Sequence, residues 1–319
     1  MRNTLYLIFG LITAWPGAMP AYAEPYIADQ YPGSVLYAPP IEFIPGVWSA
    51  IGATAPPSYE NSGHNNNLSF VVTGEGVVVI NSGASNSLAA ALHTEIRRIS
   101  NQPVVLVINE NGQGHAMLGN GYWHRQGVPI LAHAAAAEEF AANGHESLRQ
   151  MQRYNKDKAQ GTIVQPPTAT LDTEKVYEFG DFRIEVKWLG LAHSAGDIVV
   201  WLPRQRLVIA GDMAFHERLL PIFEDTQTAA WLQSWERFAA LGAVYVIPGH
   251  GHPTNMDQVT RYTRDYLLFL RGAVQQLLDA GGDLQAAYDI DQSAYAHLHT
   301  FAELAKKNAG RVFEQMEFE

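Results

Sequence analysis

From Gly46 onward, the chain alternates between short apolar runs and longer segments in which apolar residues recur every three or four positions. A short apolar run bounded by Gly, Pro or Asn predicts a buried strand, whereas the three-to-four spacing predicts a helix with one buried face. Strands are therefore predicted at residues 47–51, 68–73, 77–80, 104–108, 128–131, 175–179, 182–188, 198–202, 207–209 and 244–247. Helices are predicted at 88–99, 134–143, 226–241, 256–280 and within 298–318.

Two segments between these elements carry their own signals. Residues 203–205, Pro-Arg-Gln, separate two apolar runs and predict a hairpin. Residues 144–170 are polar, show no period and end close to Pro166-Pro167. Unstructured loops of this length are uncommon and often functional, so this stretch is either a flap over a site or a plain surface connection.

The N-terminus resembles a secretion signal. Arg2 precedes an apolar run over residues 5–19, and Ala21-Tyr22-Ala23 matches the small-x-small pattern of a cleavage site. Residues 1–23 are therefore expected to be a signal peptide and 24–43 an extended lead-in, with 44–319 a single domain that ends in helices. The protein is expected to be periplasmic or secreted. The alternative is an uncleaved anchor, which Pro16 and Pro20 disfavour because they interrupt the run.

Charge and cysteine content narrow the choice of partners. Residues 1–23 hold Arg2 and no acidic residue, so the rest of the chain has 20 Lys and Arg against 32 Asp and Glu, a net charge of −12. Nucleic acid and anionic membrane surfaces are poor partners for such a chain, so we expect a small-molecule ligand and no stable membrane association after cleavage. Cysteine is absent from the sequence, which excludes disulfides, thiolate ligands and a Cys nucleophile.

Polar clusters follow several of the predicted strands. The strand at 104–108 leads into a loop that contains Asn111, Gln113 and His115 and ends in Leu-Gly-Asn at 118–120. Further along the chain, three motifs appear in order. They are Ala192-His193-Ser194, Gly211-Asp212 and Pro248-Gly249-His250. This series resembles the metallo-β-lactamase superfamily.

The resemblance implies an α/β fold, a four-layer αββα sandwich. The family's first loop reads T-H-x-H-x-D-H-x-x-G-N. When it is aligned on residues 118–120, Asn111, Gln113, His115 and Ala116 stand where His, His, Asp and His are expected. The loop therefore looks like a metal-binding loop whose usual ligands are mostly replaced.

The resemblance implies two metal sites, and the replacements remove more ligands from the first than from the second. The first site would consist of Asn111, Gln113 and His193, and neutral amides are weak donors for Zn²⁺, so this site is expected to be lost. The second keeps His115, Asp212 and His250. The sequence thus predicts at most one divalent ion, Zn, Fe or Mn, held among His115, His193, Asp212 and His250, with Asp212 and His115 as the catalytic residues.

A site without metal is the other interpretation. Buried His and Asp side chains left over from a metal site can hydrogen-bond to one another and remain as polar core groups. Asn81, which follows a predicted strand where the family has Asp, agrees with this interpretation. Its neutrality suggests that fewer cations need to be balanced there.

Substrate contacts are expected from four residues near the loop and its neighbours. These are Asn111, Gln113, His64 and Arg218, of which Arg218 would hold an anionic group. Each has a plainer alternative, since a polar turn explains His64 and a surface ion pair explains Arg218.

Within the superfamily, the chain is similar to an exported branch associated with periplasmic quinoprotein dehydrogenases. Residues 211–219, 231–242 and the ending Phe313-Glu314-Gln315-Met316 carry this similarity. Two functions follow from it. The first is a periplasmic hydrolase-like protein with a remodelled, at most mononuclear site that acts on a small molecule. The alternative is a non-catalytic pseudoenzyme, a binding or accessory protein that serves a quinoprotein or cytochrome system.

Overall fold

The structure, a computed structural model, describes residues 31–319. The expected signal peptide and its cleavage site, together with residues 24–30 of the lead-in, lie outside the described residues.

The first sheet takes in the described chain up to residue 171 and has seven strands in sequence order. β1 to β4 pair antiparallel, whereas β4 to β7 pair parallel. β1 begins within residues 24–43, the segment that was expected to be an extended lead-in. The strands are β1 (Ile41–Ile44), β2 (Val47–Ala50), β3 (Leu68–Val72), β4 (Val77–Ile80), β5 (Val104–Ile108), β6 (Ile130–His133) and β7 (Ala169–Leu171).

The second sheet has six strands in the order β13-β12-β11-β10-β9-β8. β10 and β11 form the predicted hairpin, and β11 pairs parallel with β12. Both β11 and β12 run past their predicted ends, so that they carry Asp212 and His250. The strands are β8 (Glu174–Phe179), β9 (Phe182–Trp188), β10 (Ile198–Leu202), β11 (Leu207–Phe215), β12 (Tyr245–His250) and β13 (Thr254–Asn255).

The two sheets pack face to face through aliphatic side chains. Val78 and Ile80 of the first sheet belong to the same buried cluster as Val200 and Ile209 of the second. Successive residues of a strand point to opposite faces, so Val77 and Val79 of the same strand lie in a separate cluster on the outer face. Each sheet is therefore buried on both faces, which explains why β4 is apolar at every position.

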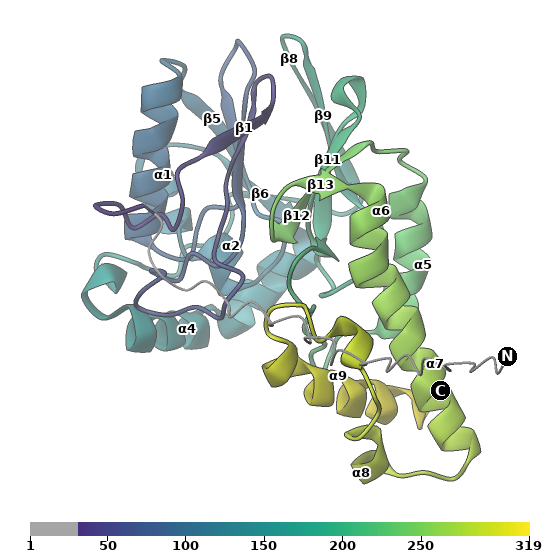
Figure 1. Ribbon diagram of the computed structural model, residues 1–319. Helices are drawn as coiled ribbons and strands as arrows, with labels where there is room; N and C mark the ends of the chain where they lie inside the picture. Colours follow the sequence, from purple (N-terminus) through teal and green to yellow (C-terminus); the bar gives the residue numbers. More distant parts are fainter. Residues whose placement is uncertain (1–30) are drawn as a thin grey trace, which may run out of the picture.

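Helices cover the two outer faces and complete the αββα sandwich that the sequence predicts (Figure 1). α1 (Asn86–Ile99), capped by the Ser85 hydroxyl, packs with α3 (Asn120–Arg125) on the first sheet. α5 (Thr228–Ala239), α7 (Asp265–Asp279) and α9 (Phe301–Met316) cover the second. The short helices are α2 (Gly114–Met117), α6 (Met256–Val259) and α8 (Leu284–Ala287).

The segment 144–170 is more regular than its sequence predicts. α4 (Ala134–Asn155) continues through its first half, and a 3-10 turn, Lys156–Ala159, follows. Gly144 lies in the middle of α4 and is buried, and a Cβ there would stand 2.9 Å from Val164 Cγ1. The glycine thus marks close packing inside a helix rather than its end. Within residues 31–319, no helix is both long and apolar enough to cross a membrane.

Candidate metal site at the sheet edge

The candidate site lies where strands of both sheets end. Asn81 follows β4 and Glu110 follows β5, two parallel neighbours in the first sheet. Asp212 lies on β11 and His250 ends β12, two parallel neighbours in the second. Because parallel strands end at the same edge of a sheet, these polar residues meet without any long loop.

Asp212 is the centre of the site. It is 1% exposed, and its carboxylate faces three imidazoles. His250 Nε2 lies 3.3 Å from Oδ1, whereas His115 Nε2 and His193 Nδ1 lie 3.6 Å and 3.7 Å from Oδ2. The four residues that the sequence proposed as metal ligands therefore converge on one point.

Glu110 is a fifth member of the site that sequence reasoning missed. It is 2% exposed, and its Oε1 lies 3.3 Å from His115 Nε2. Single ligand atoms of Glu110, His115 and Asp212 all lie within 4.8 Å of one another. The signal was an acidic residue directly after a buried strand, at the position where the family loop has Thr.

Two neighbours accommodate the Glu110 side chain. Asn81 Nδ2 donates to Oε1 at 2.8 Å, and the Glu110 amide donates to Asn81 Oδ1 at 3.1 Å. At Gly211, which has a positive φ of 54°, a Cβ would stand 1.7 Å from Glu110 Oε2. An aspartate at position 81 would place a second carboxylate against the first. The neutral Asn81 is therefore explained by the nearby carboxylate, not by missing cations as its sequence indicated.

The two amides of the loop contact the site differently from what was expected. Asn111 is fully buried and is absent from the cavity lining; its Nδ2 donates to Asp212 Oδ2 at 3.2 Å, and its Oδ1 accepts from the Gln113 amide. It therefore positions Asp212 rather than facing a ligand. Gln113 does line the cavity, where its Nε2 lies 3.3 Å from His193 Nδ1. Ala116 is packed in an apolar cluster with Phe140.

Burial and the closeness of charged neighbours shift the pKa values of the residues at the site. Burial opposes ionisation of Asp212, but the adjacent imidazoles outweigh it and hold its pKa well below its usual range. Burial and the Asp212 charge raise the pKa of Glu110. Burial lowers the pKa of His193, and burial together with Arg218 lowers that of His250 to about 4. At neutral pH these two imidazoles are uncharged, the form in which histidine binds metals.

Arg218 lies beside this cluster as a buried cation. It is 9% exposed, and its NH1 lies 3.2 Å from His250 Nδ1. That nitrogen also contacts the carbonyl oxygen of Asn65, to which it donates its proton, so it offers no lone pair to the guanidinium. Arg218 Nε has no hydrogen-bond partner, and no carboxylate of residues 31–319 lies within ion-pair distance of the guanidinium. The guanidinium is thus available to an acceptor from outside.

A cavity of about 480 Å³ opens over the site, and His115, His193, Asp212, His250 and Arg218 contribute to its lining. Glu139 of α4 lines it too, and burial together with the charge of Asp225 raises its pKa to about 7.

His64 is placed elsewhere. It is fully buried and outside this lining, and its Nδ1 accepts from the Tyr37 amide at 2.9 Å. The substrate contact expected of His64 is therefore corrected to a place in the packed interior.

The residues present fit one small divalent ion. A tetrahedral ion with bonds of ~2.0–2.1 Å holds neighbouring ligand atoms about 3.3 Å apart, close to the separations from His115 to Glu110 and from His250 to Asp212. In addition, four buried ligand atoms have no hydrogen-bond partner. They are Glu110 Oε2, His115 Nε2, His193 Nε2 and Asp212 Oδ1. Buried polar atoms are normally satisfied, so such a cluster points to a missing ligand.

Comparisons with known proteins agree with this architecture. Residues 114–250 match the family model of the metallo-beta-lactamase superfamily. A solved metallo-beta-lactamase from Pontibacter korlensis superposes with a TM-score of 0.57 at 22% identity, covering 69% of this chain and 94% of that one. The protein has the metallo-β-lactamase fold. The crystal structure of the DIM-1 metallo-beta-lactamase also has a TM-score of 0.57, at 16% identity, covering 72% of this chain and 96% of that one.

Sequence relatives support the same superfamily. The chain is 26% identical over 188 residues to a type 2 metallo-beta-lactamase of Bacteroides fragilis, covering 57% of this chain and 70% of the relative. It is 22% identical over 231 residues to the metallo-beta-lactamase IND-1 of Chryseobacterium indologenes, covering 71% and 86%. The chain is a metallo-β-lactamase-fold, hydrolase-like protein. The matched segment includes His115, Asp212 and His250, whereas Glu110 and Asn111 precede it.

Proposed function

We propose that this protein is an exported hydrolase-like protein with a remodelled site for one divalent ion, which acts on a small anionic molecule. The observation that carries the proposal is the convergence of Glu110, His115 and Asp212, with His250 next to them. Two carboxylates and two imidazoles suit Zn²⁺, Fe²⁺ or Mn²⁺.

Each residue has a defined task in this proposal. Glu110, His115 and Asp212 hold the ion, His250 and His193 flank Asp212, and Asn111 fixes the Asp212 carboxylate. The chemistry that such an ion supplies when bound is Lewis-acid activation of water and of a substrate carbonyl.

Substrate binding and proton transfer fall to other residues of the cavity. Arg218 binds an anionic group, because its buried guanidinium has unused donors there. Gln113 offers an amide to the same ligand. Glu139, with a pKa of about 7, can give or take a proton at neutral pH, which suits a general acid or base. Asp212 and His115 remain the residues closest to the chemistry.

A non-catalytic accessory protein is the second candidate. Asn111 favours it, since this buried amide spends its donor and acceptor on Asp212 and Gln113 and adds no ligand. In this case the cavity binds a ligand without transforming it, and the partner to assay is a quinoprotein or cytochrome from the exported system that the sequence resembles. Bound metal is required by the first candidate and not by the second.

Metal analysis of the purified full-length protein, made without a His tag, separates the two candidates. The hydrolase proposal expects one tightly bound equivalent of Zn²⁺, Fe²⁺ or Mn²⁺ that Asp212→Ala removes. Two equivalents, both removed by Asp212→Ala, would restore an ordinary dinuclear centre and overturn the remodelled site. No tight metal at all would favour the accessory protein.

Export has its own test. Ala21 and Ala23 place the expected cleavage after residue 23, so the mature protein should begin at Glu24. Intact mass of periplasmic material measures this directly. A chain that retains Met1 in that fraction would contradict it.

A further inference from the structure

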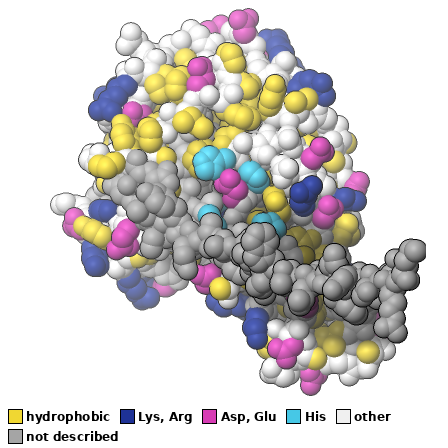
Figure 2. Space-filling view, in the orientation of Figure 1, with side chains coloured by type: hydrophobic (Ala, Val, Ile, Leu, Met, Phe, Trp, Pro, Cys, Tyr) yellow, Lys and Arg dark blue, Asp and Glu magenta, His cyan; other side chains and the backbone are white. Residues whose placement is uncertain are grey.

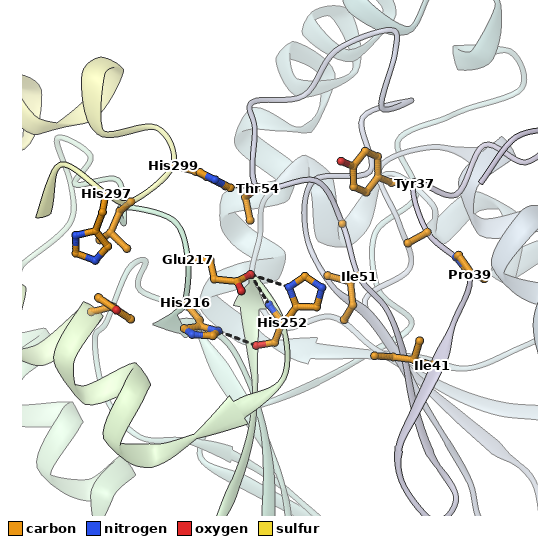
Figure 3. A pocket seen from close by; sticks show the side chains of 14 residues that line it. Tyr37, Pro39, Ile41, Ile51, Thr54, His216, Glu217, His252, His297 and His299 are labelled. Atoms are coloured by element: carbon orange, nitrogen blue, oxygen red, sulfur yellow. Dashed lines mark hydrogen bonds and ion pairs between the residues drawn. The ribbon is translucent and has the colours of Figure 1, made fainter. Parts of the chain in front are cut away.

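Figure 3 shows a second cavity, with a volume of about 510 Å³. Histidines dominate its polar lining. They are His216, His252, His297 and His299. In the space-filling view, histidine side chains gather around an acidic side chain on one face of the molecule (Figure 2). This cavity is independent of the proposed hydrolytic site, although the same two chain segments build both.

Residues 216–218 and 250–252 contribute side chains to both cavities. His250 and Arg218 point into the candidate metal site, whereas their neighbours His252 and Glu217 line the second cavity. The His216 amide donates to the His250 carbonyl at 3.2 Å. At Gly251, a Cβ would stand 2.1 Å from His216 O, so the two segments are in tight contact. The backbone that carries His216 and His252 is therefore held by close packing.

The hydrogen bonds determine which ring nitrogen of His216 and His252 carries a proton. His216 Nδ1 lies 3.0 Å from the His252 carbonyl oxygen, which can only accept. His252 Nδ1 lies 2.7 Å from Glu217 Oε2, and its backbone amide donates to the same oxygen. In the neutral form, both rings are thus protonated at Nδ1 and keep the lone pair of Nε2. A histidine that binds a metal almost always has this arrangement, with its other nitrogen donating to a carbonyl or a carboxylate.

Glu217 is held in an unfavourable conformation to make these bonds. Its φ of 61° is in the left-handed region, where residues other than glycine are uncommon. Its Oε2 accepts hydrogen bonds from both the ring Nδ1 and the backbone amide of His252. Glu217 is therefore a fixed acceptor behind the His252 ring.

The charged residues in the lining of this cavity indicate whether its ligand is a cation or an anion. Apart from its histidines, the cavity lining contains one ionisable acid, Glu217, and no Lys or Arg. A carboxylate without a neighbouring Lys or Arg in the lining favours a cationic ligand over an anionic one. Imidazole nitrogen is a preferred donor for Zn²⁺, Cu²⁺ and Ni²⁺.

We propose that this cavity is a second, separate transition-metal site, in which His216 and His252 are the anchoring ligands. Among the described residues, no three ligand atoms of this cavity lie within 4.8 Å of one another before an ion binds. His297 and His299, on the loop before α9 (Figure 3), therefore complete the coordination by side-chain rotation. The His299 Nδ1 is held by Thr54 Oγ1, which leaves its Nε2 as the ligand atom.

His297 is exposed and packs edge-on against Tyr262, with ring centroids 5.7 Å apart, so its movement breaks no buried contact. The ligand is a borderline divalent ion that exchanges with solvent, unlike the ion of the buried site.

The test uses the full-length Asp212→Ala protein, which lacks the proposed buried ion, and titrates it with Zn²⁺ in a calorimeter. One equivalent is expected to bind. His216→Asn and His252→Asn keep a donor near the Nδ1 position but remove Nε2, and each should weaken binding by more than about tenfold. Glu217→Gln should weaken it by about tenfold because outer-shell losses typically cost ~10–100-fold. His145→Asn, at an exposed histidine of α4, is the matched control and should change nothing.

A spectroscopic readout gives the identity of the ligands. Cu²⁺ bound to the same protein should show electron-paramagnetic couplings to at least two imidazole nitrogens, and the His216→Asn/His252→Asn double variant should lose them. If Asp212→Ala does not fold, Glu110→Gln provides the same background. No binding in either background, or binding that survives in the double variant, would overturn the proposal. Neither result bears on the proposed buried ion, because both backgrounds already lack it.

Discussion

The second sheet brings His193, Asp212 and His250 to the candidate site, and all three are residue types that bind metals. The first sheet brings the buried amide Asn111, yet also the carboxylate Glu110. Read along the chain, the first edge looks depleted and the second intact. In space, the first edge still supplies a carboxyl group, Glu110, from a neighbouring position. The difference teaches that a motif that fails position by position does not by itself show that the edge lacks groups able to bind a metal.

The largest expected effect is on metal binding when Glu110 is neutralised. Glu110→Gln keeps the shape and the acceptor for Asn81 Nδ2 but removes the charge. Loss of a ligand should reduce affinity by more than the ~10–100-fold typical of outer residues. Metal content after dialysis and calorimetric titration with Zn²⁺ measure it.

Glu139→Gln is the matched control, since it neutralises a half-buried acid of the same cavity that is outside the three-residue cluster. It should leave affinity within a few-fold. Equal losses in both variants would show that only the overall charge of the cavity matters, and the comparison between the two edges would fail.

A second prediction concerns restoring the family's metal-binding residues at the edge of the first sheet. The loop change that follows the family motif consists of Asn111→His, Gln113→His, His115→Asp and Ala116→His. Alone, it adds an aspartate beside Glu110, and like charges without a cation repel. Adding Glu110→Thr and Asn81→Asp removes that conflict.

The six-substitution variant should therefore bind two equivalents of Zn²⁺ under conditions in which the four-substitution variant binds fewer. Metal analysis of both proteins side by side tests it. A four-substitution protein that already binds two equivalents would mean that Glu110 does not oppose the family arrangement.

A third prediction concerns stability at the point where the two edges touch. Gly211→Ala places a Cβ 1.7 Å from Glu110 Oε2 and strains a residue with positive φ. Overpacking of this kind costs about 1–3 kcal/mol of unfolding free energy. A Glu110→Ala background removes the contacts with Oε2 and Cδ and keeps only the one with the residue 110 Cβ at 2.9 Å, so the same substitution should cost less. Urea denaturation of the unmodified protein, the two single variants and the double variant gives the coupling free energy between positions 211 and 110. A coupling free energy of zero would contradict the contact.

A fourth prediction concerns the pH dependence of stability that His64 contributes. Burial lowers its folded-state pKa to about 4, from about 6.5 when unfolded. The unfolded chain then binds the proton more tightly, so stability is complete above pH ~6.5 and falls as the pH drops towards 4. The total is about 3 kcal/mol. His64→Asn can still accept from the Tyr37 amide and should flatten this slope.

Urea denaturation between pH 4 and 7 in the presence of a chelator measures the slope, and the chelator excludes effects of metal loss. The exposed His145→Asn serves as control. An unchanged slope in His64→Asn would show that His64 is not the group that titrates.

Local pattern was sufficient for most of the architecture. β4, β5, β9 and β10 occupy the residues that their apolar runs predict, because strands buried on both faces are apolar throughout. α4 was predicted too short, since residues 144–155 are polar and begin with glycine. What extends the helix is the packing of Gly144 against Val164, a contact that helical periodicity does not contain.

Part of the candidate site could likewise be predicted from the sequence, and part could not. The sequence by itself determined which residue types stand at the strand ends, and it proposed His115, His193, Asp212 and His250. Only the tertiary structure decided that Glu110 joins them, because its direction depends on the space left by Gly211, in the other sheet. Asn111 and Asp212 are 101 residues apart in sequence and 3.2 Å apart in space. Such distances are set by how two sheets pack, and no local pattern of residues carries that information.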